Sequence, residues 1–365
     1  MRLVIDALPA RRGGLATYVR CLLAAWSEEA PEDDVTVVLT EPFAAEIASD
    51  SRRRRHRLVI RPQRRPSAAW WAARSQLLLP RLQGYGDVLL ATVPIIPVFW
   101  RRPAVAVVHD LRHEDRPADF ARTHRLARGI FFNAAYRKAD RLLADSTRTA
   151  NDLAAKYPST IDRTTVVYLG ADHVPGAFST RSSDAVAFAA KGPVRLLQAW
   201  QILKRGSVDF KLRLRIIGCT DAQKEELWRK AIQLGIAEQV QLDSYVDQND
   251  LNRLMGAASA LLLPSRFEGF GLPVLEAMRQ GVPAMISPDP TLKEVGGGHA
   301  ACAASWDPSD IAVAIRQALN MTREDLVSAR QHADQFTWRR TVRLTRANLD
   351  AALASARPRL TLSGT

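Results

Sequence analysis

The stretch LLLPSRFEGFGLPVLEAMRQGVPAMIS, residues 261–287, decides the fold. The apolar run Ala260–Leu263 is typical of a buried strand, and a glycine-rich loop follows it. Pro273 suits the first turn of a helix, where its missing N–H costs nothing. Gly269 and Gly271 allow a ligand to approach the main chain closely. The stretch therefore predicts a strand, a ligand-binding loop and a helix start.

The same stretch carries two carboxylates, Glu268 in the loop and Glu276 on the helix. The N–H groups at a helix start favour an anion such as a phosphate, whereas carboxylates accept hydrogen bonds from hydroxyls or stabilise positive charge. A ligand that has both a phosphate and many hydroxyls is a nucleotide sugar. The alternative is that both glutamates are ordinary negative residues near a helix N-terminus, which leaves the glycines and Pro273 unexplained.

Short β-branched runs alternate with helical patterns along the chain, which favours parallel sheets covered by helices. Its 365 residues fit two domains, and the Gly-, Pro- and Ser-rich residues 170–185 are typical of a linker. We expect two doubly wound Rossmann-like α/β domains that face a cleft and bind ligands at the carboxyl ends of their strands. The expected strands are Leu3–Ile5, Val35–Leu39, Leu58–Ile60, Val88–Ala91, Val105–Val108, Leu142–Ala144, Val166–Tyr168, Leu212–Ile217, Val240–Leu242, Ala260–Leu263 and Ala284–Ile286.

The formal net charge of +13 indicates attraction to acidic partners or, alternatively, an arginine-rich surface. The three cysteines, Cys21, Cys219 and Cys302, show neither metal spacing nor a disulfide pattern, which suits a reducing compartment. The N-terminal residues lack the apolar core of a signal peptide. The apolar run Val88–Trp100 is too short to span a bilayer. We therefore expect a cytoplasmic protein, or one that is peripheral on the inner face of the membrane.

Eight arginines lie between Arg52 and Arg65, and Trp70, Trp71 and a run of leucines follow them. Arginine beside tryptophan and leucine is typical of a segment that lies on anionic lipid, so residues 52–83 are a candidate membrane contact. Nucleic-acid binding is a rival explanation. A third explanation is that the segment is a solvated basic loop followed by a buried helix.

Residues 264–287 resemble the signature of family 4 of the retaining glycosyltransferases, which have the GT-B fold. Weaker similarities occur in the family's order along most of the chain. These are RRGGLATYVRCLL (11–23), VAVVHDLRHE (105–114), ADRLLADSTRT (139–149), VVYLGAD (166–172), TLKEVGGGHAA (291–301), WDPSDIAVAI (306–315) and FTWRRTVRLTRANLDAAL (336–353).

The resemblance implies a domain organisation. Residues 1–175 would form the acceptor-side domain, and residues 176–337 the domain that binds the nucleotide sugar. Residues 338–365 would be a helix and tail that return toward the first domain.

The resemblance also implies a role for each residue of the signature. Glu268 would accept hydrogen bonds from hydroxyls of the donor sugar, and Glu276 would bind the ribose of the nucleotide. The main chain around the glycine turn would hold the sugar and the diphosphate, through Gly269, Phe270, Gly271 and Leu272.

In the first domain, the resemblance implies that His109 faces the donor sugar, although a histidine packed at a strand end is an alternative. Asp110 is equally explained as a turn or helix cap. Gly13 and Gly14 would form the loop near the diphosphate and the acceptor, or a plain turn.

The family neutralises the leaving diphosphate with an arginine and a following lysine. Lys191 stands where that lysine belongs, but no arginine precedes it, and the strand and glycine expected there look shortened. Arg148, Arg181 or Arg195 would have to substitute, or turnover is weakened.

The resemblance, together with the lack of an Asp-x-Asp pair in a loop, predicts a metal-independent retaining hexosyltransferase. It would use a nucleotide diphosphate sugar, mannose-like by base rate, and transfer the sugar to a glycan or lipid-linked acceptor. The alternatives are a non-catalytic protein that binds a sugar nucleotide or a glycan and, less favoured, a basic nucleic-acid-binding protein. Its catalytic residues would be Glu268, His109 and Lys191.

Overall fold

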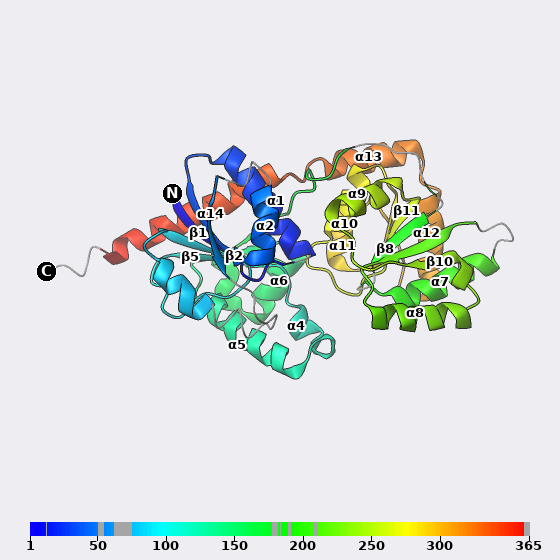
Figure 1. Cartoon of the computed structure of the whole chain (residues 1–365), viewed down its shortest axis with the longest axis horizontal. Coiled ribbons are helices and arrows are strands. Elements are labelled where there is room, and N and C mark those ends of the chain that lie inside the picture. The colour runs from blue at the N-terminus through cyan, green and yellow to red at the C-terminus, as the bar shows by residue number, and fades with distance from the viewer. Residues whose placement is uncertain are drawn as a thin grey trace. The chain divides into compact units, whose positions relative to one another are not determined.

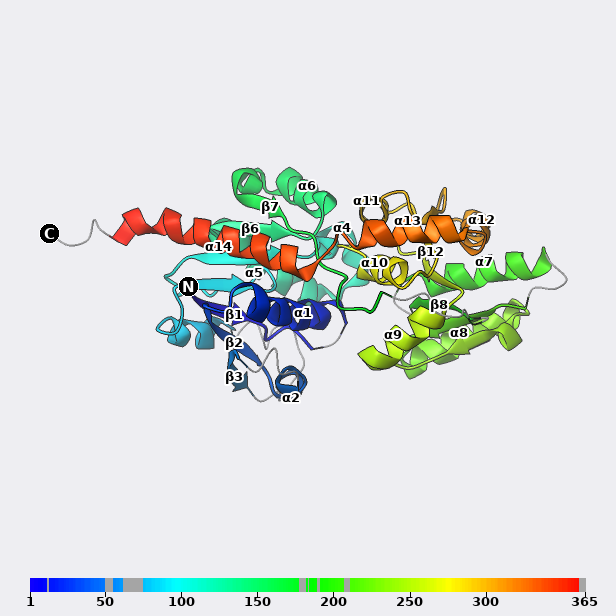
Figure 2. The same ribbon diagram turned by 90° about the horizontal axis from the view of Figure 1, so that it is seen from above.

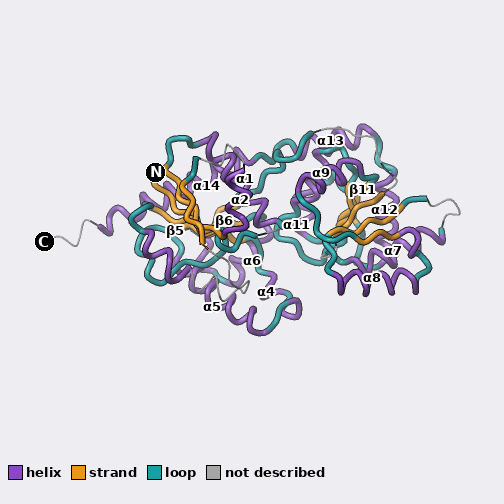
Figure 3. The backbone as a smooth tube through the Cα atoms, in the orientation of Figure 1, coloured by secondary structure: helices purple, strands orange, loops and turns teal. Residues whose placement is uncertain are grey.

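A computed structural model of the chain describes residues 1–11, 13–49, 55–61, 75–176, 182, 184–188, 191–206 and 211–360. The chain divides into two compact units, which are treated separately here. The first unit comprises Met1–Gly170 and Trp338–Thr365, and the second comprises Ala171–Thr337. Each contains one parallel sheet covered by helices (Figures 1 and 3). The two doubly wound α/β domains predicted from the sequence are thus confirmed.

The first sheet has the order β3-β2-β1-β4-β5-β6-β7, so the strand order reverses between β1 and β4. Neighbouring strands are parallel, and their carboxyl ends therefore meet at one edge of the sheet. The strands are β1 (Arg2–Asp6), β2 (Asp34–Thr40), β3 (Arg57–Arg61), β4 (Val88–Ala91), β5 (Ala104–Val108), β6 (Arg141–Ala144) and β7 (Thr164–Val166). The helices are α1 (Gly14–Glu29), α2 (Glu41–Ser49), η1 (Leu79–Leu82), α4 (Arg112–Asp115), η2 (Pro117–Asp119), α5 (Arg122–Lys138), α6 (Thr147–Lys156), η3 (Pro158–Arg163) and α14 (Trp338–Leu360).

The second sheet has the order β10-β9-β8-β11-β12-β13, and its strand order reverses between β8 and β11. Its neighbouring strands are also parallel. The strands are β8 (Asp184–Phe188), β9 (Arg213–Ile217), β10 (Val240–Leu242), β11 (Ala260–Leu263), β12 (Ala284–Ile286) and β13 (Ala301–Cys302). The helices are α7 (Pro193–Arg205), α8 (Asp221–Gln233), η4 (Ala237–Gln239), α9 (Gln248–Ala257), α10 (Leu272–Arg279), α11 (Pro290–Gly296), α12 (Pro308–Leu319) and α13 (Arg323–Ala333).

The structure corrects the predicted strands at three places. β8 was not among the predicted strands, and the strand before Lys191, which looks shortened in the sequence, has five residues. The serines before it and Asp184 at its start look like a linker, but its pairing with β9 and β11 makes it one of the two central strands. β13 was also missed because it has only two residues. β7 covers residues 164–166 rather than the predicted 166–168.

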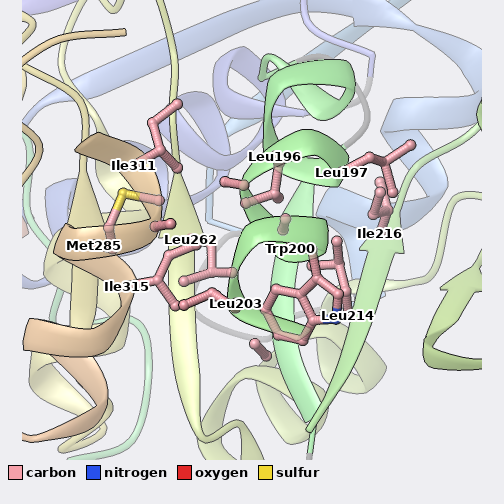
Figure 4. Close-up of a cluster of buried hydrophobic side chains, with 14 of the residues drawn as sticks. Leu196, Leu197, Trp200, Leu203, Leu214, Ile216, Leu262, Met285, Ile311 and Ile315 are labelled. Carbon is pink, nitrogen blue, oxygen red and sulfur yellow. The ribbon is translucent and has the colours of Figure 1, made fainter. Parts of the chain in front are cut away.

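A buried apolar cluster fixes α7 on the second sheet (Figure 4). Trp200 and Leu196 of α7 belong to it, together with Leu262 of β11 and Ile311 of α12. All four side chains are fully excluded from solvent. This packing places the N-terminus of α7, with Lys191 and Gly192 just before it, beside the end of β8.

Helix α14 packs on the first unit (Figure 2). Arg346 bonds to the buried Asp33 carboxylate, with Nε 2.9 Å from Oδ2. Arg343 pairs with Glu29 of α1 at 2.8 Å. The long C-terminal helix is therefore held by charge pairs as well as by packing.

Asp6, the last residue of β1, is a buried carboxylate at the carboxyl edge of the first sheet. Ser75 Oγ donates to it at 2.9 Å, and the Leu8 N–H donates at 3.1 Å. Burial raises the pKa of Asp6 from its ordinary 3.8 to about 6, because these hydrogen bonds only partly offset the loss of water.

We expect Asp6→Asn to flatten the dependence of stability on pH. The folded chain holds the Asp6 proton more tightly than the unfolded chain does. The resulting stabilisation is therefore fully present below the unfolded pKa of 3.8 and is lost as pH rises through about 6. The loss amounts to about 3 kcal/mol. Urea unfolding at several pH values checks this, with Asp34→Asn at an exposed position of β2 as the control. A difference between wild type and Asp6→Asn that stays constant with pH would contradict it.

Candidate active site

The carboxyl ends of β8 and β11 form the central part of the candidate site in the second unit. They lie at the point where the strand order reverses, which is where doubly wound sheets bind ligands. Lys191 follows β8, and Glu268 lies in the loop after β11. A Cβ on Gly192 would lie 2.8 Å from the Pro264 carbonyl oxygen, so the two loops approach too closely for a side chain there.

Glu268 is buried and makes two short polar contacts. Lys191 Nζ lies 2.6 Å from its carboxylate, and Ser265 Oγ donates to Oε1 at 2.5 Å. The Ser265 carbonyl oxygen in turn accepts from Trp306 Nε1 at 3.1 Å. Glu268 is thus held in one orientation with a cation beside it, as a side chain that positions a ligand requires.

The glycine turn before α10 has the backbone that the sequence predicts. Gly271 is the N-cap of α10 at φ 95°, in the left-handed region, and a Cβ there would lie 2.7 Å from Leu292 Cδ2. Leu272 and Pro273 begin the helix. The first amides of a helix have no partner one turn earlier, and the helix dipole favours an anion at this end. The turn therefore suits a phosphate.

Glu276 is buried on α10 and pairs with a residue that the sequence analysis missed. His173 Nε2 lies 3.0 Å from Glu276 Oε1. The segment that carries His173 is tied to the second unit, because the Ala171 N–H donates to the Phe336 carbonyl and Arg279 Nε donates to the Val174 carbonyl. Glu276 therefore has one oxygen engaged by an imidazole.

In the first unit, His109 follows β5 and uses both ring nitrogens. Nδ1 lies 2.5 Å from Asp145 Oδ2, and Nε2 lies 2.9 Å from the Thr92 carbonyl oxygen. Both partners are acceptors, so both nitrogens donate when the ring is an imidazolium. Burial by itself lowers the pKa of His109, but the Asp145 carboxylate outweighs burial and the pKa is raised. The ring of Tyr18 packs edge-on against the His109 ring, with the two ring centroids 5.2 Å apart.

The remaining predicted residues of the first unit have simple backbone roles. Gly13 is the N-cap of α1 at φ 70°, and its carbonyl accepts from the Thr17 N–H at 3.1 Å. Gly14 is the first residue of α1. Asp110 Oδ1 accepts from the Arg112 N–H at 2.9 Å, which is the turn role given to it as an alternative.

Of the three cations considered as a substitute for the family arginine, Arg181 lies outside the described residues. Arg148 belongs to the first unit and bonds to Asp152 at 2.7 Å. Arg195 lies in the first turn of α7, near Lys191 in sequence, and its Nη1 is buried without a hydrogen-bond partner among the described residues.

The structure thus brings Lys191, Glu268 and the turn before α10 together at one edge of the second sheet. It adds Ser265, His173, Asp145 and Thr92 to the predicted residues. Ser265 lies in the signature three residues before Glu268, a spacing that the sequence analysis did not use. Asp145 directly follows a predicted strand, Leu142–Ala144, and this position at the carboxyl end of a strand is also a readable signal. No local pattern indicates His173.

No group of three or more His, Cys, Asp or Glu side chains among the described residues could hold a metal ion. No helix within the described ranges is long and apolar enough to cross a membrane.

Comparison with known proteins gives two family matches. Residues 12–174 match the Glycosyltransferase Family 4 model, and residues 185–335 match the model of Glycosyl transferases group 1. A D-inositol 3-phosphate glycosyltransferase of Geodermatophilus obscurus is 29% identical over 67% of this chain and 60% of its own length. The O-antigen chain mannosyltransferase B of Escherichia coli is 34% identical over 39% of this chain and 38% of its own length. The chain therefore spans less than two thirds of either relative.

A crystal structure of HepE from Anabaena in complex with UDP and glucose has the same fold. Its TM-score is 0.74 at 17% identity, covering 96% of this chain and 100% of that one. The two family models together match most of the sequence, and both units have the expected parallel sheets. The chain belongs to family 4 of the glycosyltransferases and has the GT-B fold.

Proposed function

We propose that the protein is a retaining glycosyltransferase that moves a hexose from a nucleotide diphosphate sugar to a glycan or lipid-linked acceptor. The observation that carries the proposal is the contact of Lys191 with Glu268, at the carboxyl ends of β8 and β11 and beside the turn before α10. At one edge of the sheet, the buried carboxylate can bind the hydroxyls of the donor, and the cation and the helix start can bind its diphosphate.

In this proposal the carboxylates bind hydroxyls and the positive groups bind the diphosphate. Glu268 accepts hydrogen bonds from the sugar, and Glu276 accepts them from the ribose. Lys191 and the first amides of α10, with the main chain of Gly269 and Phe270, hold the phosphates. Charge builds on the leaving diphosphate in the transition state, and fixed positive groups stabilise it there.

The bonds change on one face of the sugar. The bond from the anomeric carbon to the diphosphate oxygen breaks, and the acceptor oxygen bonds to that carbon from the same side. The proton of the acceptor hydroxyl passes to the departing phosphate oxygen. In this proposal His109, whose pKa the Asp145 carboxylate raises, contacts the donor sugar, and the main chain of Gly13 and Gly14 contacts the diphosphate and the acceptor.

The donor and acceptor classes are supported by the relatives. HepE was solved with UDP and glucose, and one relative is named as a mannosyltransferase of an O-antigen chain. We propose a mannose-like hexose by base rate. Cys21, Cys219 and Cys302 are free thiols, which suits work in the cytoplasm or at the inner face of a membrane.

A non-catalytic protein that binds sugar nucleotides is the second candidate. It is favoured by one observation, the absence from the sequence of an arginine at the family position before Lys191. If turnover occurs, we propose Arg195 as the second cation. Turnover of a nucleotide sugar separates the two candidates.

We expect Glu268→Gln to lower kcat by roughly a hundredfold or more, because it removes the charge that orients Lys191 and the sugar. Release of nucleoside diphosphate measures this, with a donor first selected by thermal shift over a panel of nucleotide sugars. Glu225→Gln, at an exposed position of α8, is the control. Unchanged turnover in a folded Glu268→Gln protein would reject the proposed site.

We expect turnover without a divalent metal, because Lys191 and the start of α10 supply the positive charge that a metal would otherwise provide. Wild-type rates measured with and without EDTA check this. Loss of activity in EDTA that is restored by a divalent cation would contradict it.

We expect Glu276→Gln to raise the donor KM roughly tenfold and to change kcat little, since a hydrogen bond to a charged group is worth about 1.5–3 kcal/mol. A donor that lacks one ribose hydroxyl should bind wild type and variant alike. If the variant still discriminates between ribose and deoxyribose as wild type does, Glu276 does not bind the ribose.

A further inference from the structure

Helix α5 of the first unit exposes two large apolar side chains on one side. Leu126 is 67% exposed and Ile130 is 60% exposed. Residues four apart lie one above the other on a helix, so the two side chains form a continuous apolar strip. Ala134 and Lys138 continue this side of the helix, and both are exposed.

Three more exposed apolar side chains lie near the C-terminal end of α5, two of them in a loop and one in a neighbouring segment. Val98 and Phe99 are each 70% exposed, and Leu77 in the neighbouring segment is 66% exposed. Lys138 Nζ, at the end of α5, donates to the Pro97 and Val98 carbonyls at 2.5 and 2.6 Å. The loop therefore lies beside the helix end.

Two glutamines also hold this loop in place. Gln76 Oε1 accepts from the Val98 N–H at 2.8 Å. Gln83 Nε2 donates to the Phe99 carbonyl at 3.2 Å, and its Oε1 accepts from the Arg101 N–H at 2.8 Å. The apolar side chains are thus presented by a loop that is fixed on both sides.

Basic residues surround these apolar side chains. The sequence of α5, RTHRLARGIFFNAAYRK, contains five arginines and lysines and no acidic residue. Arg122, Arg125 and Arg137 on the helix, and Arg101 and Arg102 at the loop, are exposed.

Two acidic residues near this surface, Asp119 and Asp87, are paired with arginines. Asp119 bonds to Arg112 at 2.8 Å and to Arg116 at 3.1 Å. Asp87, which also pairs with Arg2 at 2.6 Å, lies 3.5 Å from Arg102. The surface keeps its excess of positive charge.

We propose that the α5 surface, made of α5 and the Val98–Phe99 loop with Leu77, binds the surface of an anionic phospholipid bilayer. Large apolar side chains in a basic surround match the boundary between acyl chains and charged headgroups. The aliphatic and phenyl groups enter that boundary, and the arginines contact lipid phosphates.

The surface fits a bilayer better than the other two occupants. Two copies of this chain joined symmetrically through it would place like charges against each other. Nucleic acid would pair with the arginines but would leave the aliphatic side chains of Leu126 and Ile130 without apolar contact. Residues 52–83 were the membrane contact predicted from the sequence; half of them lie outside the described residues, but Leu77 belongs to that range.

The inference rests on the proposed function in one respect: membrane binding would bring a lipid-linked acceptor to the enzyme. Binding itself is measured without donor or acceptor. The full chain is floated with vesicles of phosphatidylcholine alone, or of equal parts phosphatidylcholine and phosphatidylglycerol. The test variant is Leu126→Gln/Ile130→Gln, with Val98→Ser/Phe99→Ser as an independent second variant.

The matched control is Trp228→Gln/Ile232→Gln on α8 of the second unit. These side chains are 45% and 57% exposed and are also four residues apart. Circular dichroism and thermal melting confirm that each variant is folded. Glu268→Gln is included because it should still bind vesicles, so failure of the proposed chemistry and failure of the membrane inference are distinguishable.

We expect wild type to bind the vesicles that contain phosphatidylglycerol and to be released by about 0.5 M NaCl. Either α5-surface variant should bind roughly tenfold more weakly, and the control should bind as wild type does. Equal binding to both vesicle types, or equal loss in the α8 control, would overturn the inference. So would a dimer of wild type in sedimentation that Leu126→Gln/Ile130→Gln dissociates, or tighter binding to RNA than to the anionic vesicles.

Discussion

The contact between Lys191 and Glu268 is the interaction on which the candidate site depends. It joins the loop after β8 to the loop after β11, across the point where the strand order of the second sheet reverses. Burying a carboxylate without a partner costs free energy, and the charge of Lys191 offsets this cost for Glu268. The close approach of Gly192 to Pro264 brings the two loops near enough for the contact to form.

Two other charged side chains of the candidate site are also held by a partner that can carry the opposite charge. Glu276 pairs with His173, and His109 pairs with Asp145. Each of these side chains, for which we propose a role in binding the donor, is therefore already oriented by a partner within its own unit. Pre-oriented groups lose less freedom when they bind a ligand, so the proposed nucleotide sugar would not have to order these side chains when it binds.

Asp6 and the α5 surface show two different consequences of charge. Asp6 loses water at the end of β1 with only hydroxyl and amide donors beside it, and its pKa rises. Arg122, Arg125 and Arg137 of α5 are exposed and keep their water, and we propose that they bind an external partner together with the apolar side chains beside them. Burial of an ionisable group shifts its pKa and so makes stability depend on pH, whereas an exposed charge is available to bind a partner.

The sequence by itself determined the two doubly wound units, most of their strands and the turn from Glu268 to Pro273, because these depend on local apolar patterns, glycine conformations and helix capping. It did not reveal β8, whose polar flanks conceal a strand that only its neighbours define. Nor did it reveal the pairing of His173 with Glu276, which lie 103 residues apart. Only the tertiary structure decided these, because a parallel sheet pairs strands that are distant in sequence, and because hydrogen bonds of Ala171 and Val174 hold the His173 segment against the second unit.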